Sequence, residues 1–371
     1  MQAGRDYIYG KTVREHSRRT WRTLPPYFGG AAARLLVECM TIKEIAALVG
    51  TSRGTVDRVL NGRGNVRPEL ADQVRRIAKE HGYKPNKLAQ ALVNSQKHWV
   101  IGIIINSVSN PFFDDVLQGI RARAEYYKSH GLTVLIREIR GYDEQEQLEV
   151  IRQMKKDSVD ALGITPLDYP SIAQAVNELD VPVVTFNTDA ESVRRLAFVG
   201  CDYLNSGRLS GDMVKLLLPG GGKVGVVIGN SHILGHLQRV EGLRSSLAGE
   251  PSIEIVDVVE NSDDDERSYE VTKKLILDQS PDLVYFASAG IQGGVQAVRD
   301  LGTPCKVITV DDTDFIREGL NDGIIAATVT QEPDVQGSRT VDILYNCLAN
   351  HIKPDNIMNY TNNHVKLRSS K

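Results

Sequence analysis

The 371-residue sequence has no long apolar run, and its first residues lack the apolar stretch that a secretory signal needs. A membrane-spanning helix requires about 20 consecutive apolar residues, so none is expected. The cysteines are few, far apart and without a CxxC pair: Cys39, Cys201, Cys305 and Cys347. Reduced core thiols in a cytoplasm fit this spacing better than a disulfide framework or a zinc site.

Sequence motifs that compel catalysis are also missing. No HExxH occurs, and no Ser/His/Asp order points to a nucleophilic site. The glycine-rich PGGGK at 219–223 precedes an apolar run and has no Ser or Thr after its lysine, so it predicts a turn and not a phosphate loop. His232 and His236 are isolated in a loop, where histidines are usually structural or solvated. We therefore expect no enzyme, no catalytic residue, no metal site and no cofactor.

Charge is unevenly distributed along the chain. Residues 40–97 hold 11 Lys or Arg against 5 Asp or Glu, and residues 1–39 hold 7 against 3. Residues 98–371 hold 26 against 39, so a basic N-terminal part precedes an acidic remainder. This asymmetry indicates that only the N-terminal part meets a polyanion, although chance clustering would give the same counts.

Residues 40–85 carry the pattern of a helix-turn-helix. TIKEIAALVG has apolar residues at helical spacing, a capping box of Thr41 and Glu44, and a final glycine that ends the helix. The next stretch, TSRGTVDRVLNGRGNV, has Val56 and Val59 on one helical face and hydrogen-bonding groups on the other. The second helix of a helix-turn-helix lies in the DNA major groove, which accounts for so polar a face on so short a helix.

A third helix and a shorter fourth one follow. RPELADQVRRIAKEHG begins with Pro68 near its start and ends at Gly82, as capping preferences predict. The apolar residues of NKLAQALVNS predict a hinge helix or linker at 86–97, which is marginal alone and needs a dimer partner and DNA. Residues 1–39 show no sustained period and are expected to be a disordered extension, with an extra basic DNA arm as the alternative.

The unbroken stretch from TIKEIAALVG to NKLAQAL resembles the DNA-binding head of the LacI/GalR family of bacterial transcription regulators. The resemblance implies a homodimer or a tetramer that reads a pseudo-palindromic operator, with hinge helices paired in the minor groove. It also implies these DNA-binding residues: Thr51, Ser52, Arg53, Gly54, Thr55, Arg58, Asn61, Leu88 and Leu92.

Positions within this set differ in their implied roles. Arg53 and its two successors occupy the family's base-reading positions, and Leu92 stands where the family inserts a leucine between base pairs. Asp57 replaces the family's usual serine, so it either orients a neighbouring arginine or accepts from a cytosine amino group. Met40 stands where such proteins usually begin, which favours an overlong start for residues 1–39.

From Trp99 onward, apolar runs alternate with amphipathic stretches. WVIGIII, LTVLIRE, ALGIT, PVVTFN, KVGVVIGN, LVYFAS and KVITVDD predict buried parallel strands, with helices between them. Such alternation specifies doubly wound α/β folding, and the length suits two units. The predicted fold class is therefore an all-α helix-turn-helix head followed by a two-lobed, doubly wound α/β body.

Residues 98–371 resemble the ribose-binding-like branch of the type I periplasmic sugar-binding proteins in SNPFFDDVLQG, FNTD, VDDTD and TVTQEPD. The resemblance implies an effector domain with lobe 1 at about 98–202 and 332–355 and lobe 2 at about 203–331 and 356–371. It places a ligand between the lobes, on these residues: Asn110, Phe112, Phe113, Asn187, Asp189, Asp311 and Gln331. Phe112 and Phe113 could equally be core residues, and Asp311 could cap the following helix.

Departures from the family's pattern leave the ligand open. GHLQRVEGL has Leu237 where an arginine is common, SDDDERSYE has only acids where a second aromatic is common, and ASAGIQGG lacks an asparagine–aspartate pair. A polyol or an amino sugar therefore competes with a simple sugar. We expect a cytoplasmic, ligand-responsive repressor of carbohydrate-related genes, associated with the nucleoid when it binds DNA. A secreted solute receptor and a sugar-modifying enzyme are the competing function classes.

Overall fold

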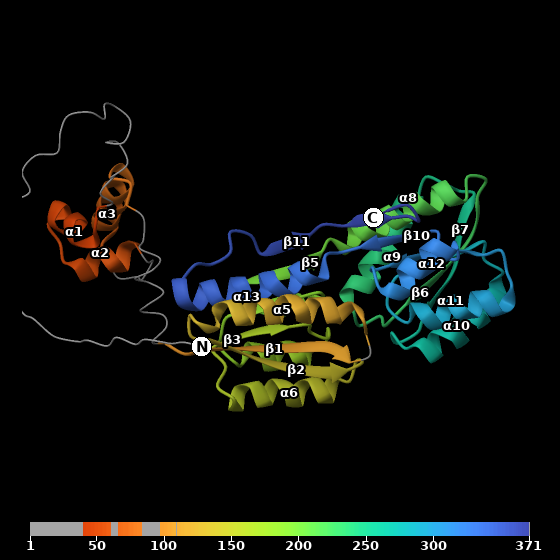
Figure 1. Cartoon of the computed structure of the whole chain (residues 1–371), viewed down its shortest axis with the longest axis horizontal. Coiled ribbons are helices and arrows are strands. Elements are labelled where there is room, and N and C mark those ends of the chain that lie inside the picture. The colour runs from red at the N-terminus through yellow and green to blue at the C-terminus, as the bar shows by residue number, and fades with distance from the viewer. Residues whose placement is uncertain (1–39, 61–65, 84–96, 109, 371) are drawn as a thin grey trace, which may run out of the picture. The chain divides into compact units, whose positions relative to one another are not determined.

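The computed structural model describes residues 40–60, 66–83, 97–108 and 110–370. These residues divide into two compact units, a head that ends near residue 84 and a body that follows it. Residues 1–39 and all but the last residue of the predicted hinge helix lie outside the described part, so those two predictions stay untested. Figure 1 labels the helices and strands of both units.

The head is built from helices α1 (Ile42–Val49), α2 (Arg53–Leu60) and α3 (Pro68–Glu80). The predicted capping box is present, because the Thr41 side chain accepts from the Glu44 amide and Glu44 Oε2 accepts from the Thr41 amide at 2.7 Å. Gly50 ends α1 in the left-handed conformation with φ 71°. The small apolar core between the helices contains Ile45, Ala46, Val56, Val59, Ala71, Val74 and Ala78.

Lobe 1 of the body is a six-stranded parallel sheet in the order β11-β5-β4-β3-β1-β2. Its described strands are β1 (Trp99–Val108), β2 (Leu132–Arg140), β3 (Ala161–Ile164), β4 (Val183–Phe186), β5 (Ala197–Cys201) and β11 (Met358–Thr361). Its helices are α5 (Phe112–Lys128), α6 (Glu144–Lys156), α7 (Pro170–Asn177) and α13 (Pro333–Asn350). One core lies between the sheet and α5 with α13, and a second lies under α6 and α7.

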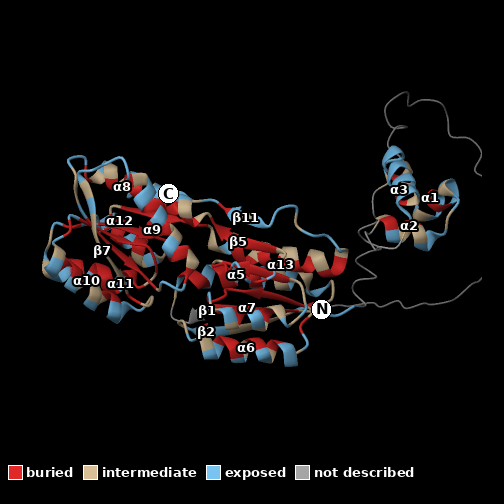
Figure 2. Ribbon diagram, turned by 180° about the vertical axis from the view of Figure 1, so that it is seen from behind, coloured by how far each residue is buried: buried red, intermediate tan, exposed pale blue. Residues whose placement is uncertain are grey.

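Lobe 2 repeats this plan in the order β12-β10-β9-β8-β6-β7, with β12 antiparallel to its neighbour. Its described strands are β6 (Gly222–Ile228), β7 (Ile253–Glu260), β8 (Leu283–Phe286), β9 (Lys306–Val310), β10 (Ala327–Thr330) and β12 (His364–Lys366). Its helices are α8 (Tyr203–Leu217), α9 (Leu234–Leu247), α10 (Asp265–Gln279), α11 (Ile291–Leu301) and α12 (Asp314–Asp322). The central strands are buried along their whole length, as in β3, β4, β5, β8 and β10, whereas the edge strand β7 is only partly buried (Figure 2).

The chain crosses between the lobes at residue 202, at 331–332 and at 362–363. Hydrogen bonds tie these crossings together: Asn363 Nδ2 donates to the Asp202 carbonyl at 2.9 Å, and the Asn362 amide donates to Glu332 Oε2 at 2.9 Å. The predicted assignment of 356–371 to lobe 2 is wrong for β11, which pairs with β5 in lobe 1. The terminal strands are short and follow a long helix, so their pairing partner is not readable from local pattern.

Each lobe packs one helix pair through reciprocal glycines. A methyl group on Gly337 of α13 would lie 2.0 Å from the Val116 carbonyl oxygen, and one on Gly119 of α5 would lie 2.1 Å from the Asp334 carbonyl oxygen. In lobe 2, a methyl group on Gly207 of α8 would lie 2.1 Å from the Arg239 carbonyl oxygen of α9. Such close approach requires the absence of a side chain. The same close packing of a helix pair occurs in both lobes, which supports their description as two versions of one unit.

Candidate functional site

The exposed face of α2 is the first candidate site. Ser52 caps the helix, since its hydroxyl accepts from the Thr55 amide at 3.1 Å and lies 2.9 Å from the Thr55 hydroxyl. Arg53, Gly54 and Arg58 are exposed, while the two valines of the helix are buried in the head core.

The structure thus places the predicted polar residues of α2 on one outward surface. Arg58 Nε donates to the Gly54 carbonyl at 3.2 Å, one helical turn before it. Thr51 is half-buried at the turn before the helix. Asn61, Leu88 and Leu92 lie outside the described residues, so their predicted DNA contacts remain predictions.

The second candidate site is a cavity between the lobes, with a volume of about 50 Å³. It lies at the carboxyl ends of both sheets, where the strand order reverses between β1 and β3 in lobe 1 and between β6 and β8 in lobe 2. Ligands of doubly wound sheets bind in the crevice at this position. Its volume would hold a few ordered water molecules or the polar groups of one small molecule.

Six of the seven predicted ligand residues line this cavity: Asn110, Phe112, Phe113, Asn187, Asp311 and Gln331. Phe112 and Phe113 are each 6% exposed and pack edge to face, with ring centroids 5.2 Å apart. They belong to the lobe 1 core and also form one cavity wall, so a core role does not exclude ligand contact, which stays a prediction. Asn110 Oδ1 accepts from the Phe112 amide at 3.1 Å and thereby begins α5.

Asp311 and Arg239 are the charged pair at the lobe 2 side of the cavity. Gln331 Nε2 donates to Asp311 Oδ1 at 2.6 Å, and burial raises the pKa of Asp311 while the Arg239 guanidinium opposes that rise. Arg239 is only 3% exposed, and its Nη1 donates to the Ala287 carbonyl at 2.8 Å. Its Nε and Nη2 have no hydrogen-bond partner in the described part of the chain.

A buried guanidinium with two unused donors is costly unless an acceptor reaches it. The ring of Tyr203 lies 4.7 Å from the Arg239 guanidinium and partly compensates its charge. Oxygen atoms of a bound molecule would supply the missing acceptors. The cavity is therefore built for a ligand with several hydroxyl or other oxygen groups.

Tyr203 of lobe 2 and Asn187 of lobe 1 connect the two lobes at the side of the cavity where the chain crosses between them. The Tyr203 hydroxyl donates to the Asn187 carbonyl, and Asn187 has a left-handed backbone with φ 60°. Asp311 has the same kind of conformation, with φ 70°. Strained conformations of non-glycine residues at the ends of strands are typical of binding sites, where the fold holds a side chain in place.

The prediction that Asp189 binds ligand is wrong. Its carboxylate accepts from Thr185 Oγ1 at 2.7 Å, from the Ala190 amide at 3.0 Å and from Arg195 Nη2 at 2.5 Å. All three donors belong to lobe 1, and Asp189 does not line the cavity. β4 ends at Phe186 and Asn187 has a left-handed backbone, so the alternation of a strand does not continue through these residues. Asn187 and Thr188 both line the cavity, and the buried Thr188 hydroxyl lacks a described partner.

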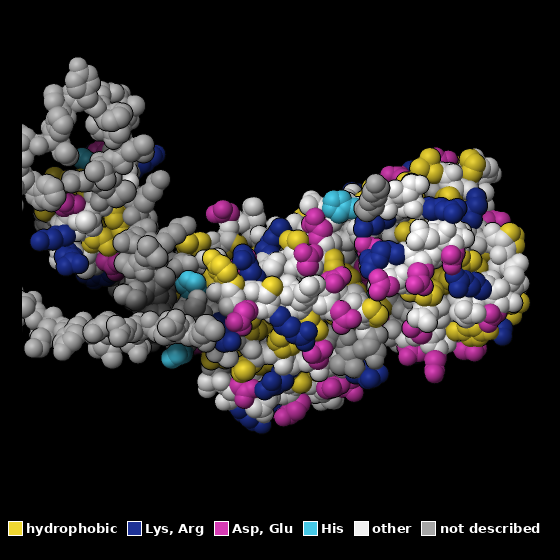
Figure 3. All heavy atoms as spheres, in the orientation of Figure 1, with side chains coloured by type: hydrophobic (Ala, Val, Ile, Leu, Met, Phe, Trp, Pro, Cys, Tyr) yellow, Lys and Arg dark blue, Asp and Glu magenta, His cyan; other side chains and the backbone are white. Residues whose placement is uncertain are grey.

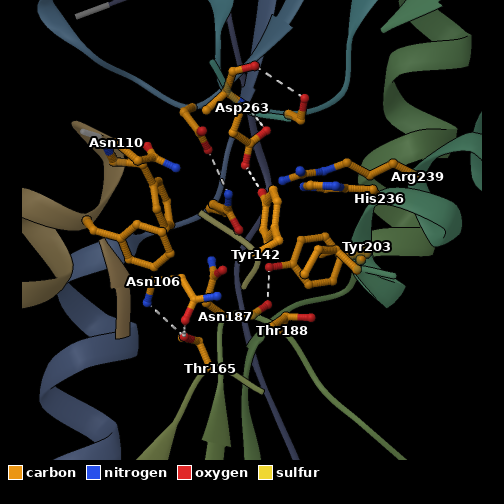
Figure 4. Close-up of a pocket in the computed structure, with 18 residues that line it drawn as sticks. Asn106, Asn110, Tyr142, Thr165, Asn187, Thr188, Tyr203, His236, Arg239 and Asp263 are labelled. Carbon is orange, nitrogen blue, oxygen red and sulfur yellow. Dashed lines mark hydrogen bonds between the residues drawn. The ribbon is translucent and has the colours of Figure 1, made fainter. Parts of the chain in front are cut away.

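The cavity also contains residues that sequence reasoning missed, and Figure 4 labels most of them. They are Asn106, Tyr142, Thr165, Thr188, Tyr203, Ile233, Gly235, His236, Arg239, Asp263, Ser288 and Ala289. Asn106, Thr165 and Ser288 follow apolar strands, so their strand-end positions were a usable signal. Arg239 lies inside a helix and gave no such signal. Burial lowers the pKa of His236, which keeps its ring neutral.

No cluster of three or more potential metal ligands occurs in the described parts of the chain. None of the helices within those parts is long and apolar enough to cross a membrane.

Each of the two units matches a known protein family. Residues 41–86 match the family of bacterial regulatory proteins, lacI family, and residues 101–351 match the periplasmic binding protein domain. The chain belongs to the periplasmic binding protein domain family through its body, and its head matches the lacI family of bacterial regulatory proteins. The lacI match agrees with the prediction that the chain is not an enzyme.

Among curated relatives, the chain is similar to catabolite control protein A. The protein from Staphylococcus epidermidis is 28% identical over 213 residues, which cover 56% of this chain and 61% of the relative. The one from Staphylococcus aureus strain Mu50 is 27% identical over 197 residues, covering 52% and 56%. The matches thus span about six-tenths of the length of these relatives.

Solved structures confirm the predicted fold class of the body. The glucose-galactose binding protein GanP of Geobacillus stearothermophilus has a TM-score of 0.68 at 22% identity, over 73% of this chain and 98% of that one. A solute binding protein of Burkholderia graminis, solved with D-arabinose, has a TM-score of 0.68 at 21% identity, over 73% and 96%. At such identities the likeness establishes the fold alone.

Proposed function

We propose that this LacI-family protein is a ligand-responsive, sequence-specific transcription regulator that represses carbohydrate-related genes. One observation carries the proposal: a helix-turn-helix with an exposed polar second helix is joined, in one chain, to a two-lobed body with a buried polar cavity. The proposed effector is a sugar, a polyol or a related oxygen-rich molecule, in agreement with the unused donors of Arg239.

The same proposal includes the partners and the location of the protein. It acts as a homodimer, or as a tetramer of two such dimers, on double-stranded operator DNA with twofold symmetry. The predicted domain limits, 40–85 for the head and 98–371 for the body, are part of the proposal. It works in the cytoplasm and is associated with the nucleoid while bound to DNA.

A gel-shift titration with the purified full chain tests this function. The DNA is the region upstream of its own gene, and random DNA of equal length is the control. We expect a specific complex whose midpoint changes when D-arabinose, D-allose, D-glucose, D-galactose or a matching polyol is added. A specific affinity no greater than that for random DNA would reject the regulator.

The two competing functions have less support. A secreted solute receptor would use the body and leave the polar face of α2 without a role. A sugar-modifying enzyme would need a nucleophile or an acid–base pair directed at the cavity. Within the described lining, Asp263 already accepts from Tyr142 and Ala289, and His236 is hydrogen-bonded to the Asn230 backbone.

A further inference from the structure

Tyr142 and Asp263 connect the two lobes across the cavity. Tyr142 follows β2 in lobe 1 and Asp263 follows β7 in lobe 2, and the Tyr142 hydroxyl donates a hydrogen bond to Asp263 Oδ2 (Figure 4). Both side chains line the cavity. A molecule in the cavity would therefore touch the residues that join its two walls.

The position of this contact within the sheets is informative. β2 and β7 are the outermost strands at one edge of their sheets, whereas the three crossings lie at the opposite edge, beside β5, β10 and the C-terminal strands. When two lobes rotate about their crossings, atoms at the far edge separate most. The Tyr142–Asp263 bond therefore has to break for the cavity to open.

Asp263 is held in place to receive the tyrosine. Its Oδ1 accepts from the Ala289 amide at 3.1 Å, and its own amide donates to Asn261 Oδ1 at 2.8 Å. Ser262 and Asp263 both have left-handed backbones, with φ 57° and 56°. Conformations of this kind persist only where the surrounding structure enforces them. Both carboxylate oxygens thus have protein donors, which leaves Asp311 as the available carboxylate of the cavity lining.

A second contact supports closure on the same side. The ring of His232 in lobe 2 stacks on Tyr169 in lobe 1, with centroids 4.7 Å apart, and the His232 carbonyl accepts from the Asp168 amide at 3.4 Å. The next residue, Ile233, is 7% exposed and packs in the apolar core of lobe 1. Contacts between protein groups of the two lobes therefore occur at more than one place beside the cavity.

We propose that Tyr142 and Asp263 form a latch that joins the lobes across the cleft and restricts it to ligands small enough to be enclosed behind it. The proposal rests on the cleft as the effector site of the proposed function. The enclosed ligand is a neutral single-ring sugar or polyol, because the free charged groups facing the cavity are one carboxylate, Asp311, and one guanidinium, Arg239.

Hydrogen–deuterium exchange of the ligand-free full chain tests the latch directly. The proteins are wild type, Tyr142→Phe, Asp263→Asn and the double variant, with Tyr126→Phe as a control because Tyr126 is 59% exposed and lies away from the cavity. We expect exchange about tenfold faster in Tyr142→Phe for peptides around Ala289 and around Asp168, since one hydrogen bond to a charged group is lost.

Exchange at the peptide that contains Asp168 shows whether the Tyr142–Asp263 bond holds the whole cleft closed or stabilises only its own surroundings. The Asp168 amide contacts the other lobe through His232, at a contact that neither substituted side chain makes. Faster exchange there in both single variants, with no further increase in the double variant, supports a joint latch. Unchanged exchange at the Asp168 peptide in Tyr142→Phe overturns it, whatever happens near Ala289.

The size limit has its own test by thermal shift of the full chain. D-galactose, D-arabinose and D-allose are compared with lactose and with galactose 6-phosphate, in wild type and in Tyr142→Ala. Stabilisation of wild type by a neutral monosaccharide and by neither larger nor phosphorylated probes supports the limit. Greater stabilisation of wild type by lactose or by the phosphate overturns it. A wild-type midpoint that none of these probes shifts overturns the ligand class proposed here, whereas operator binding by gel shift separately judges the proposed function.

Discussion

The head and the body contrast in how their candidate sites are made. The head offers one face of the eight-residue helix α2, and its polar residues are contiguous in sequence. The cavity of the body is lined by residues at or beyond the carboxyl ends of ten strands, from Asn106 in β1 to Gln331 after β10. A site whose residues are contiguous can be predicted from a sequence motif. A site whose residues are dispersed along the chain forms only when all the contributing strands pack correctly. The comparison predicts that substitutions will separate cleanly into those that change DNA binding and those that change ligand binding.

Surface charge adds to this contrast. Figure 3 shows Asp and Glu side chains interspersed with Lys and Arg over the visible face of the body, without a single basic patch there. The basic excess of the chain lies before residue 98. Contacts to DNA phosphates require clustered cations, so the body is expected to add little to DNA affinity by itself.

The largest expected effect is on the stability of the body. Gly337→Ala would place a methyl 2.0 Å from the Val116 carbonyl and force α13 and α5 apart. We expect a loss of about 3 kcal/mol in the unfolding free energy of the body, measured by urea denaturation. Gly249→Ala is the matched control, since no atom lies within 4 Å of its added methyl. Equal stability of the two variants would mean that the helices separate easily, and the close packing would lose its structural role.

The second-largest effect should be on ligand binding, with DNA binding unchanged. Asp311→Asn keeps the shape of the side chain but removes the negative charge that accepts from ligand hydroxyls, so ligand affinity should fall about 10- to 100-fold. DNA binding without ligand should remain at the wild-type level, measured by gel shift with and without the sugar panel. Asp312→Asn is the control, because Asp312 is paired with Lys366 at 2.6 Å and does not line the cavity. A wild-type response in Asp311→Asn would remove this residue from the site.

A comparable or smaller effect should appear on the DNA side. Arg58→Ala should weaken operator binding by about 1–3 kcal/mol if a base contact is lost, or lower the salt dependence by one contact if a phosphate contact is lost. Ligand affinity should not change. Arg76→Ala removes the same charge from exposed α3 and serves as the control. Operator affinity and salt slope both equal to wild type would show that Arg58 faces away from DNA.

The smallest expected effect concerns residues 1–39. The helix-turn-helix is complete from Thr41, whose capping box begins α1. Deletion of residues 1–39 should leave the melting curve and specific operator affinity unchanged within error, with some loss of nonspecific affinity from the removed arginines. A marked drop in operator affinity on the native sequence alone would establish a DNA-reading arm.

Sequence by itself determined the helix-turn-helix, because helix periodicity, the Thr41–Glu44 box and the glycine turn are local properties of the chain. It also determined the alternation of strands and helices in the body, since strands buried on both faces need continuous apolar runs. Strand-end reasoning found Asp311 and Gln331 for the same reason: parallel strands end at one edge of the sheet.

Tertiary structure alone decided three further features. Asp189 turns into lobe 1 because Arg195 and Thr185 satisfy its carboxylate there. β11 joins lobe 1 although the residues after the last crossing return to lobe 2. Tyr142 meets Asp263 across 121 positions of sequence, and this contact exists only because the lobes close on each other. Local propensity acts over one or two turns of chain, whereas these contacts join residues that only the packing of the folded chain brings together.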